Sequence, residues 1–288
     1  MNVTCSAIRD DMIGGVVACL ERGFPRRSKS YWASSLQRMS RLPAIEGYPR
    51  LGYALEASGQ VVGVILLLFS RRRDADREYV RCNISSFCAD AAYRSSAILL
   101  HMAAVKHKEV TYFNISPASH TLSFIEALGF RRISDGQVLL VPSLSALQPD
   151  VRVSVFGADD AASARLNENE RRILADHAAL GCIALVCATG DAVFPFVFQR
   201  RKLRDLILCA QLIYCRNMEE MVRFAGSLGR VLLLRCGPFL IVDANGPIPG
   251  LVGRYFPEQS PKYFKGISHR TSATSHTPNW LSSAPELV

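Results

Sequence analysis

The chain has 288 residues, of which 49% are hydrophobic and 20% charged, and its formal net charge is +9. This composition is that of a globular protein, and the length favours two domains over one. The positive charge is spread along the chain, and the basic triplet Arg71–Arg73 is followed at once by acidic residues, so we expect no nucleic-acid surface. The apolar run Val61–Phe69 is too short to cross a membrane as a helix, so we expect no membrane partner.

Nine cysteines occur without regular spacing. An odd number argues against a disulfide framework, and those in apolar runs, such as Cys19 and Cys187, fit small core positions. No Cys-x-x-Cys pair is present, so we predict no metal site. Reduced cysteines are typical of the cytoplasm, where we expect this protein to lie.

The first half predicts an α/β (mixed α+β) fold. The elements expected there are, in chain order, a strand, helices over 10–22 and 30–39, strands over 51–57, 61–70 and 78–88, a helix over 97–108, a strand over 110–114, a helix over 120–128 and a strand around 138–141. Antiparallel strands that give way to strand–helix–strand crossovers predict a mixed, mostly antiparallel sheet flanked by helices.

The second half resembles the first. Its expected elements are a helix over 165–179, a hairpin of 183–187 with 193–198, a strand over 210–214, a helix over 219–228 and strands around 231–235 and 239–243. Aligning Gly229 with Gly129 brings Phe224 onto Phe124. From the hairpin glycine onward this alignment spans 39 residues in the second half and 70 in the first, so we predict that the second copy lacks the turn and helix after its third strand. A chance resemblance is the alternative.

The corresponding domain prediction is a first domain over 1–142, a linker over 143–150 and a second, smaller domain over 151–265. Residues 266–288 are rich in Ser and Thr and show no apolar period, which predicts a disordered tail.

The stretch from Arg81 to Arg132 carries the clearest functional signal. A strand feeds the small-residue turn Tyr93-Arg94-Ser95-Ser96-Ala97, which opens an apolar helix. Such a turn presents free backbone N–H groups and the positive end of a helix, an arrangement that suits a phosphate. An ordinary capped helix start is the alternative.

This strand–turn–helix–strand–helix segment resembles the acyl-CoA site of the GCN5-related N-acyltransferases, and it implies a tandem of such domains with a degenerate second copy. In that family the strand before the helix separates from its neighbour, and the pantetheine arm of acyl-CoA pairs with the exposed backbone. The pyrophosphate then lies on an Arg/Gln-x-x-Gly-x-Gly/Ala turn. Here Ala97 and Leu99 stand at the two glycine positions.

A second family pattern, Asn-x-x-Ala-x-x-Phe-Tyr-x-x-x-Gly-Phe, is matched by Phe124 and by Leu128-Gly129-Phe130. Ala118 stands where Asn is usual, and Ile125 replaces the Tyr that protonates the departing thiolate in many members. The resemblance therefore implies acetyl-CoA or another acyl-CoA as co-substrate, but it leaves the proton donor open.

The resemblance implies the following site residues. Those expected to bind the co-substrate are Phe87, Cys88, Arg94, Ser95, Ser96, Ala97, Ile98, Leu99, Asn114, Ser116, Thr121 and Phe124. Those considered for acid–base catalysis are Glu56, Glu78, Tyr112 and His120. Tyr31 and Trp32 could line the acceptor pocket.

The function that the sequence predicts is transfer of an acyl group from acyl-CoA to an amine of a small molecule or peptide. The alternative is a catalytically degenerate protein of the same fold that acts as an acyl-CoA sensor or interaction module. The identity of the acceptor and the oligomeric state are left open.

Overall fold

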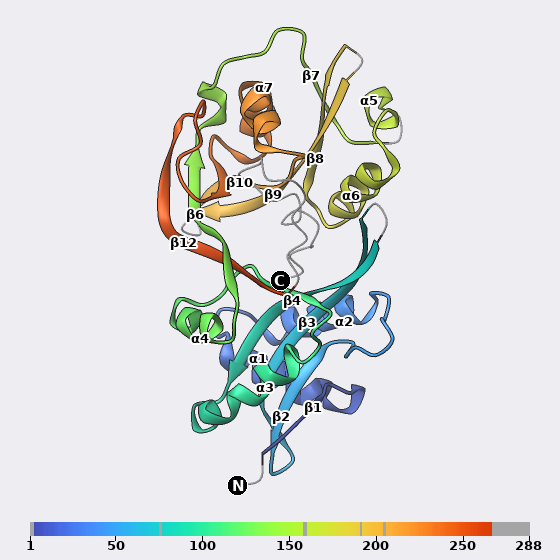
Figure 1. The fold of residues 1–288 in the computed structure, drawn as a ribbon, viewed down its shortest axis with the longest axis vertical. Helices are drawn as coiled ribbons and strands as arrows, with labels where there is room; N and C mark the ends of the chain where they lie inside the picture. The colour runs from blue at the N-terminus through green and yellow to red at the C-terminus, as the bar shows by residue number, and fades with distance from the viewer. Residues whose placement is uncertain (1–2, 75–76, 158–159, 191, 204–205, 267–288) are drawn as a thin grey trace. The chain divides into compact units, whose positions relative to one another are not determined.

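The computed structural model describes residues 3–74, 77–157, 160–190, 192–203 and 206–266 (Figure 1). They form two compact units: unit 1 holds 3–133 and 262–266, and unit 2 holds 134–261. Two strands, β6 (Arg131–Leu140) and β12 (Gly253–Lys265), contribute residues to both units. The predicted tail lies, apart from Gly266, outside the described residues, and the predicted domain ranges remain a prediction.

Unit 1 is built on a sheet with the strand order β1-β2-β3-β4-β5-β12. Its pairs are antiparallel except for β4 with β5, which is parallel. The elements are, in chain order, β1 (Val3–Ala7), η1 (Asp10–Met12), α1 (Ile13–Gly23), α2 (Lys29–Ser40), β2 (Gly52–Ala57), β3 (Gln60–Asp74), β4 (Arg77–Ala89), η2 (Ala91–Ala97), α3 (Ile98–Ala104), β5 (Thr111–Asn114), η3 (Ser119–Thr121) and α4 (Leu122–Ala127).

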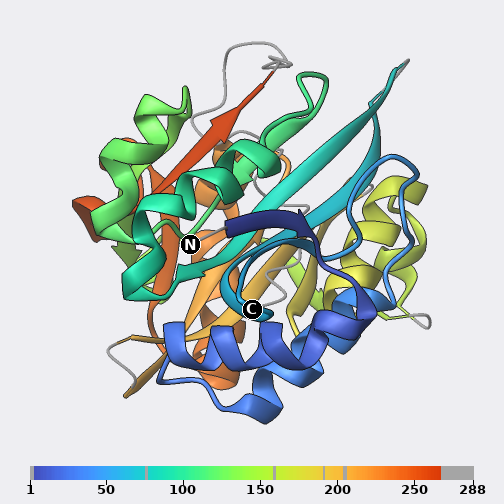
Figure 2. The same ribbon diagram turned by 90° about the horizontal axis from the view of Figure 1, so that it is seen from below.

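Helices cover both faces of this sheet, as Figure 2 shows. On β3, Val64 and Leu66 pack against α1 and α2, whereas Ile65 and Leu67 pack on the side of α3 and α4. All four residues are fully buried. A strand covered on both faces is apolar along its length, which explains the unbroken run that the sequence shows here.

Unit 2 has the strand order β12-β6-β11-β10-β9-β8-β7. Its pair β10 with β11 is parallel, as β4 with β5 is in unit 1. The further elements are η4 (Pro142–Leu144), β7 (Arg152–Val155), α5 (Ala161–Ala164), α6 (Glu168–Ala179), β8 (Ile183–Thr189), β9 (Ala192–Leu203), β10 (Ile207–Tyr214), α7 (Met218–Cys236) and β11 (Leu240–Ala244).

The strand predicted around 231–235 is wrong, because α7 continues as one helix to Cys236. The run Val231–Leu234 is too short to show a period by itself. The helix buries Leu228 and Leu232 and leaves Leu234 90% exposed, a pattern with helical spacing.

The predicted alignment of Gly229 with Gly129 is also wrong. β10, α7 and β11 follow one another as β4, α3 and β5 do, and the two strands are parallel in each case. α7 therefore corresponds to α3 and not to α4, so the helix that was predicted to be missing is present in unit 2. Gly229 lies in mid-helix, where an added Cβ would come within 2.3 Å of the Ser143 backbone N. Gly226 likewise faces the backbone of Ser145 and Ala146, so the chain after β6 packs directly on α7.

Three further differences concern short or irregular elements. The strands β7 and β12 were not predicted. The helix expected over 97–108 is a 3₁₀ turn, η2, followed by the seven-residue α3. The helix expected over 165–179 starts instead at Asn167, whose side chain accepts from the N–H of Glu170 in a capping box. Among the described helices, none combines the length and apolar character that a membrane span requires.

We predict that unit 1 depends on the last residues of β12. Tyr263 is fully buried in its core, pairs with Asn114 of β5 and donates a hydrogen bond to Glu126. The substitution Tyr263→Ala should lower the stability of unit 1 by about 3–5 kcal/mol, and Tyr263→Phe by about 1–2 kcal/mol. Hydrogen–deuterium exchange at 111–114 measures the effect. Tyr255→Ala, in the part of β12 that belongs to unit 2, is the control; unchanged exchange at 111–114 in Tyr263→Ala would contradict the prediction.

Candidate functional site

The central feature of unit 1 is a gap between two parallel strands. β4 and β5 pair only over Arg81–Asn83 and Thr111–Phe113, and β5 ends at Asn114. β4 continues to Ala89 with β3 as its remaining neighbour among the described strands. The other edge of β4, from Ile84 onward, therefore presents backbone groups that an extended ligand can pair with.

A β-bulge lies in the part of β4 that pairs with β3 but not with β5. Ile65 of β3 pairs with Phe87 and Leu66 pairs with Ser85, so Ser86 is an extra residue, and its φ is +36°. A bulge bends a strand and redirects the side chains that follow it. Here it places Phe87 on the face of the sheet that α3 and α4 cover.

A buried histidine lies beside this gap. His101 of α3 is 3% exposed, and its ring centroid is 4.2 Å from that of Phe87 and 4.9 Å from that of Phe124. Neither ring nitrogen has a hydrogen-bond partner among the described residues. Burial lowers the pKa of His101 to about 4, so the imidazole is neutral near pH 7.

The predicted phosphate turn is formed by η2 and the start of α3. Arg94 and Ser95 are exposed, Ser96 and Ile98 are half-buried, and Ala97 is 8% exposed. Leu99 is 38% exposed, and its carbonyl accepts a weak hydrogen bond from the Cys5 thiol. Leu99 thus lies on the outer side of α3, away from the buried side that holds His101.

An ion pair and a thiol pair flank the start of the turn. Arg22 of α1 donates to both carboxylate oxygens of Asp90, at 3.1 and 2.7 Å, which offsets a negative charge next to the turn. Cys88 lies 3.9 Å from Cys19, sulfur to sulfur, and this contact together with burial raises the pKa of the Cys88 thiol. A protonated thiol is a poor nucleophile, so Cys88 is suited to lining the site.

The remaining residues predicted to bind the co-substrate follow β5. Asn114 ends β5 and is half-buried, whereas Ser116 is exposed in the loop that follows. The Thr121 hydroxyl donates to the carbonyl of Ala118, 2.7 Å away, which holds the entry to α4. Phe124 contacts His101, and Ile125, at the usual Tyr position, is buried in the core without a polar group to offer.

Of the four residues considered for acid–base catalysis, the three with described side chains lie on three different strands. Glu56 lies on β2, two strands and therefore about 10 Å from β4. Glu78 pairs with Arg71 and precedes Phe87 by nine residues of β4, or roughly 30 Å. The hydroxyl of Tyr112 accepts the backbone N–H of His107, and burial raises its pKa. His120 belongs to η3, and its side chain is not among those described.

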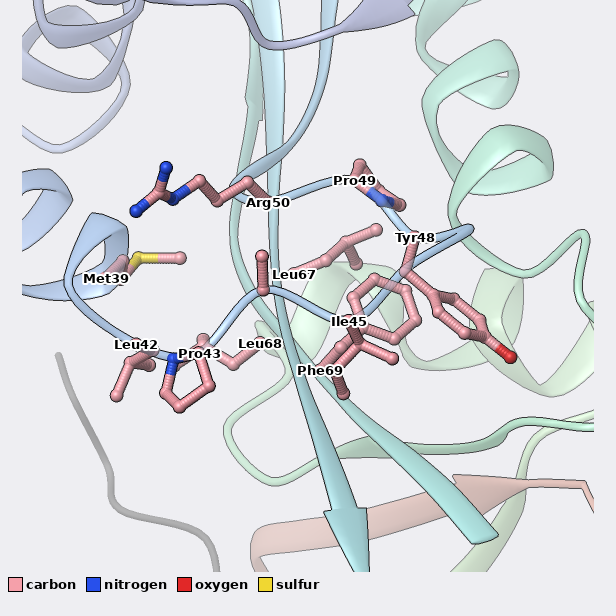
Figure 3. Close-up of a pocket in the computed structure, with 11 residues that line it drawn as sticks. Met39, Leu42, Pro43, Ile45, Tyr48, Pro49, Arg50, Leu67, Leu68 and Phe69 are labelled. Atoms are coloured by element: carbon pink, nitrogen blue, oxygen red, sulfur yellow. The ribbon is translucent and has the colours of Figure 1, made fainter.

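An apolar pocket lies at a different edge of the unit (Figure 3). It is formed by the end of α2, the loop over 41–50 and residues 67–69 of β3, and the ring centroids of Tyr48 and Phe69 lie 4.7 Å apart. It lies on the β2 side of β3, so β3 and β4 separate it from the gap. Trp32 of α2, predicted to line an acceptor pocket, is 1% exposed and packs in the core, and the ring of Tyr31 meets it edge-on.

His101 is the residue that the sequence analysis missed. The sequence does indicate that His101 is buried, because it follows the helical spacing of Ala97, Leu100 and Ala104 on the buried side of α3. A histidine at such a position is unremarkable in a sequence. Only the three-dimensional arrangement shows that its nitrogens are left without partners.

Unit 2 has a parallel pair but a different helix start. β10 and β11 pair over Ala210–Gln211 and Leu240–Ile241. At the start of α7 the Asn217 side chain accepts the N–H of Glu220, and Glu219 and Glu220 place acidic groups in the first turn. Negative charge and an occupied N–H both disfavour an anion there.

The chain has the fold of the GCN5-related N-acetyltransferases. Such a protein from Anabaena variabilis ATCC 29413 matches it with a TM-score of 0.59 at 10% identity, over 91% of this chain and 72% of that one. A probable N-acyltransferase from Enterococcus faecalis V583 gives a TM-score of 0.57 at 10% identity, over 93% and 73%. A GCN5-related N-acetyltransferase from Kribbella flavida gives 0.56 at 12%, over 91% and 71%.

No protein-family model and no curated protein sequence matches the chain. At identities of 10–12%, these structural likenesses establish the fold alone.

We predict that acid weakens unit 1 through His101. Its pKa is about 4 in the folded state against 6.5 for the ordinary side chain, so the unfolded chain binds the proton more readily. The free energy of unfolding of unit 1 therefore keeps its full value, as far as His101 is concerned, above about pH 6.5. It falls by about 3 kcal/mol in total as the pH falls toward 4. Urea unfolding between pH 7 and 4 measures it. His101→Phe should lack this component; an identical pH dependence in that variant would contradict the prediction.

Proposed function

We propose that unit 1 is an acyl-CoA-dependent N-acyltransferase that transfers a short acyl group to an amine. The observation that carries this proposal is the early end of the β4–β5 pairing, which leaves the edge of β4 that faces away from β3 without a strand partner from Ile84 to Ala89. The turn with Arg94, Ser95 and Ser96 follows directly after this edge. Extended arms of amide character pair well with such an edge. The fold of the GCN5-related N-acetyltransferases supports the same assignment.

The residues present fit an acyl-CoA. Exposed Arg94 can pair with the pyrophosphate, and the hydroxyls of Ser95 and Ser96 add donors at the same turn. Arg22 pairs with the carboxylate of Asp90, next to the turn, and so reduces its repulsion of the pyrophosphate. The free edge of β4 near Phe87 and Cys88, opposite β3, can hold the pantetheine arm and direct a backbone N–H at the thioester carbonyl. The bound acyl-CoA supplies the acyl group.

The chemistry that these residues offer is mainly positioning. Phe87 and Phe124 are apolar walls that exclude water from the reacting end of the arm, and the β4 backbone can stabilise the charge that develops on the carbonyl oxygen. Among the acid–base candidates whose side chains are described, Glu56, Glu78 and Tyr112 do not converge at Phe87. Deprotonation of the amine by solvent is therefore part of this proposal.

A catalytically degenerate protein that senses acyl-CoA is the second candidate. It is favoured by Ile125, which is buried where many members of this fold have a Tyr that protonates the leaving thiolate. Unit 2, with its acidic helix start, is proposed to be a degenerate copy without a co-substrate. Binding and turnover separate the two candidates.

We predict that acetyl-CoA binds unit 1 through Arg94. Acetyl-CoA at 100 times its Kd should stabilise the protein by about 2.7 kcal/mol, a rise in Tm of roughly 5–10 °C. Arg94→Glu should weaken binding roughly 10- to 100-fold, since it replaces a charge-assisted hydrogen bond by repulsion. Isothermal titration calorimetry measures both proteins. Arg152→Glu, an exposed position on β7, controls for the change in net charge; equal Kd values for the two variants would count against the turn.

We predict turnover with an amine substrate. A panel of small amines and peptides with free N-termini, mixed with acetyl-CoA, should release free CoA thiol at rates that rise with pH until the amine is deprotonated. A thiol-reactive dye measures the release. Arg94→Glu should raise KM for acetyl-CoA more than it lowers kcat, because Arg94 contacts the non-reacting end. Tight acetyl-CoA binding without release for any amine would support the sensor instead.

A further inference from the structure

His101 is buried in surroundings that do not satisfy its polar atoms. It is 3% exposed, and the rings of Phe87 and Phe124 lie against it at 4.2 and 4.9 Å between centroids. Neither ring nitrogen has a hydrogen-bond partner among the described residues. A buried polar group without a partner is unfavourable, so a polar group of a ligand that reached the ring would stabilise it.

The position of His101 shows where that partner would lie. Phe87 belongs to the part of β4 that has no β5 partner, and Phe124 belongs to α4, which follows β5. His101, on α3, contacts both, so its ring lies between the two sides of the gap. Both walls are aromatic, and the imidazole is the polar group between them.

The chemistry of the imidazole narrows the partner further. A neutral imidazole has one N–H donor and one acceptor nitrogen, and an anion would find no compensating positive charge in this apolar setting. A neutral group that carries both acceptors and donors fits best. The arm of an acyl-CoA has this character, with two amides and a thioester carbonyl, whereas its nucleotide end is strongly anionic.

We propose that His101 is a binding residue for acyl-CoA, and that its ring hydrogen-bonds a polar group of the pantetheine arm at the thioester end. This inference rests on the proposed function and assigns it a residue outside the phosphate turn. His101 thereby fixes how deep the arm enters the gap beside Phe87 and Phe124. It acts by positioning, and no proton transfer is assigned to it.

The test uses His101→Phe, which keeps a ring between the two phenylalanines and removes both nitrogens, in the full-length chain. Isothermal titration calorimetry is carried out with acetyl-CoA and with 3′-phosphoadenosine 5′-diphosphate, the nucleotide that lacks the arm. We expect the variant to bind acetyl-CoA about tenfold more weakly, a typical loss for one buried hydrogen bond, and to bind the armless nucleotide as the wild type does. His101→Asn, which keeps donor and acceptor in a smaller side chain, should recover part of the affinity.

A second measurement does not depend on how the variants fold. In wild-type protein labelled with ¹⁵N-histidine, acetyl-CoA should shift the ring nitrogen signals of His101, and the armless nucleotide should leave them in place. If wild type binds acetyl-CoA but His101→Phe binds it equally well, or loses both ligands alike, this inference is overturned while the proposed function stands. If wild type binds no acyl-CoA, the proposed function itself fails.

Discussion

The pairing of β4 with β5 ends after three residues on each strand, and the candidate site of unit 1 depends on this early end. Parallel strands that paired further would satisfy each other's backbone and leave no edge for a ligand. The bulge at Ser86 and the short length of β5 keep them apart. The turn that opens α3, the aromatic walls and the buried histidine all lie around the space that results.

Unit 2 shows that this backbone arrangement alone does not make a binding site. It repeats the parallel pair followed by a helix, yet its helix begins with a capping asparagine and two acidic residues. The asparagine accepts a hydrogen bond from a free N–H group of the helix, and the acidic residues interact favourably with its positive end. Both interactions stabilise the helix. The same groups compete with an anion, so stability at this helix start opposes the binding of a diphosphate.

The sequence alone predicted what depends on local patterns. The strand β3 and the hairpin that joins it to β2 follow from an apolar run and a glycine turn, and the turn before α3 follows from small residues between a strand and a helix. It could not predict β12, whose partner β5 is nearly 150 residues away, or the continuous α7, whose Val231–Leu234 run fits either period. The sequence could not predict the unpaired ring nitrogens of His101 either, since they depend on which residues the fold places around the ring.

The exchange of strands between the units has a consequence for synthesis. Unit 1 gains its last strand from Tyr263–Lys265, so the ribosome has to reach Lys265, about 150 residues after β5, before the core around β5 can close. Until then Thr111–Asn114 lacks a neighbour on one side, and an open strand edge is a place where nascent chains associate wrongly. A chaperone that holds this segment during translation would protect the protein at its most vulnerable stage.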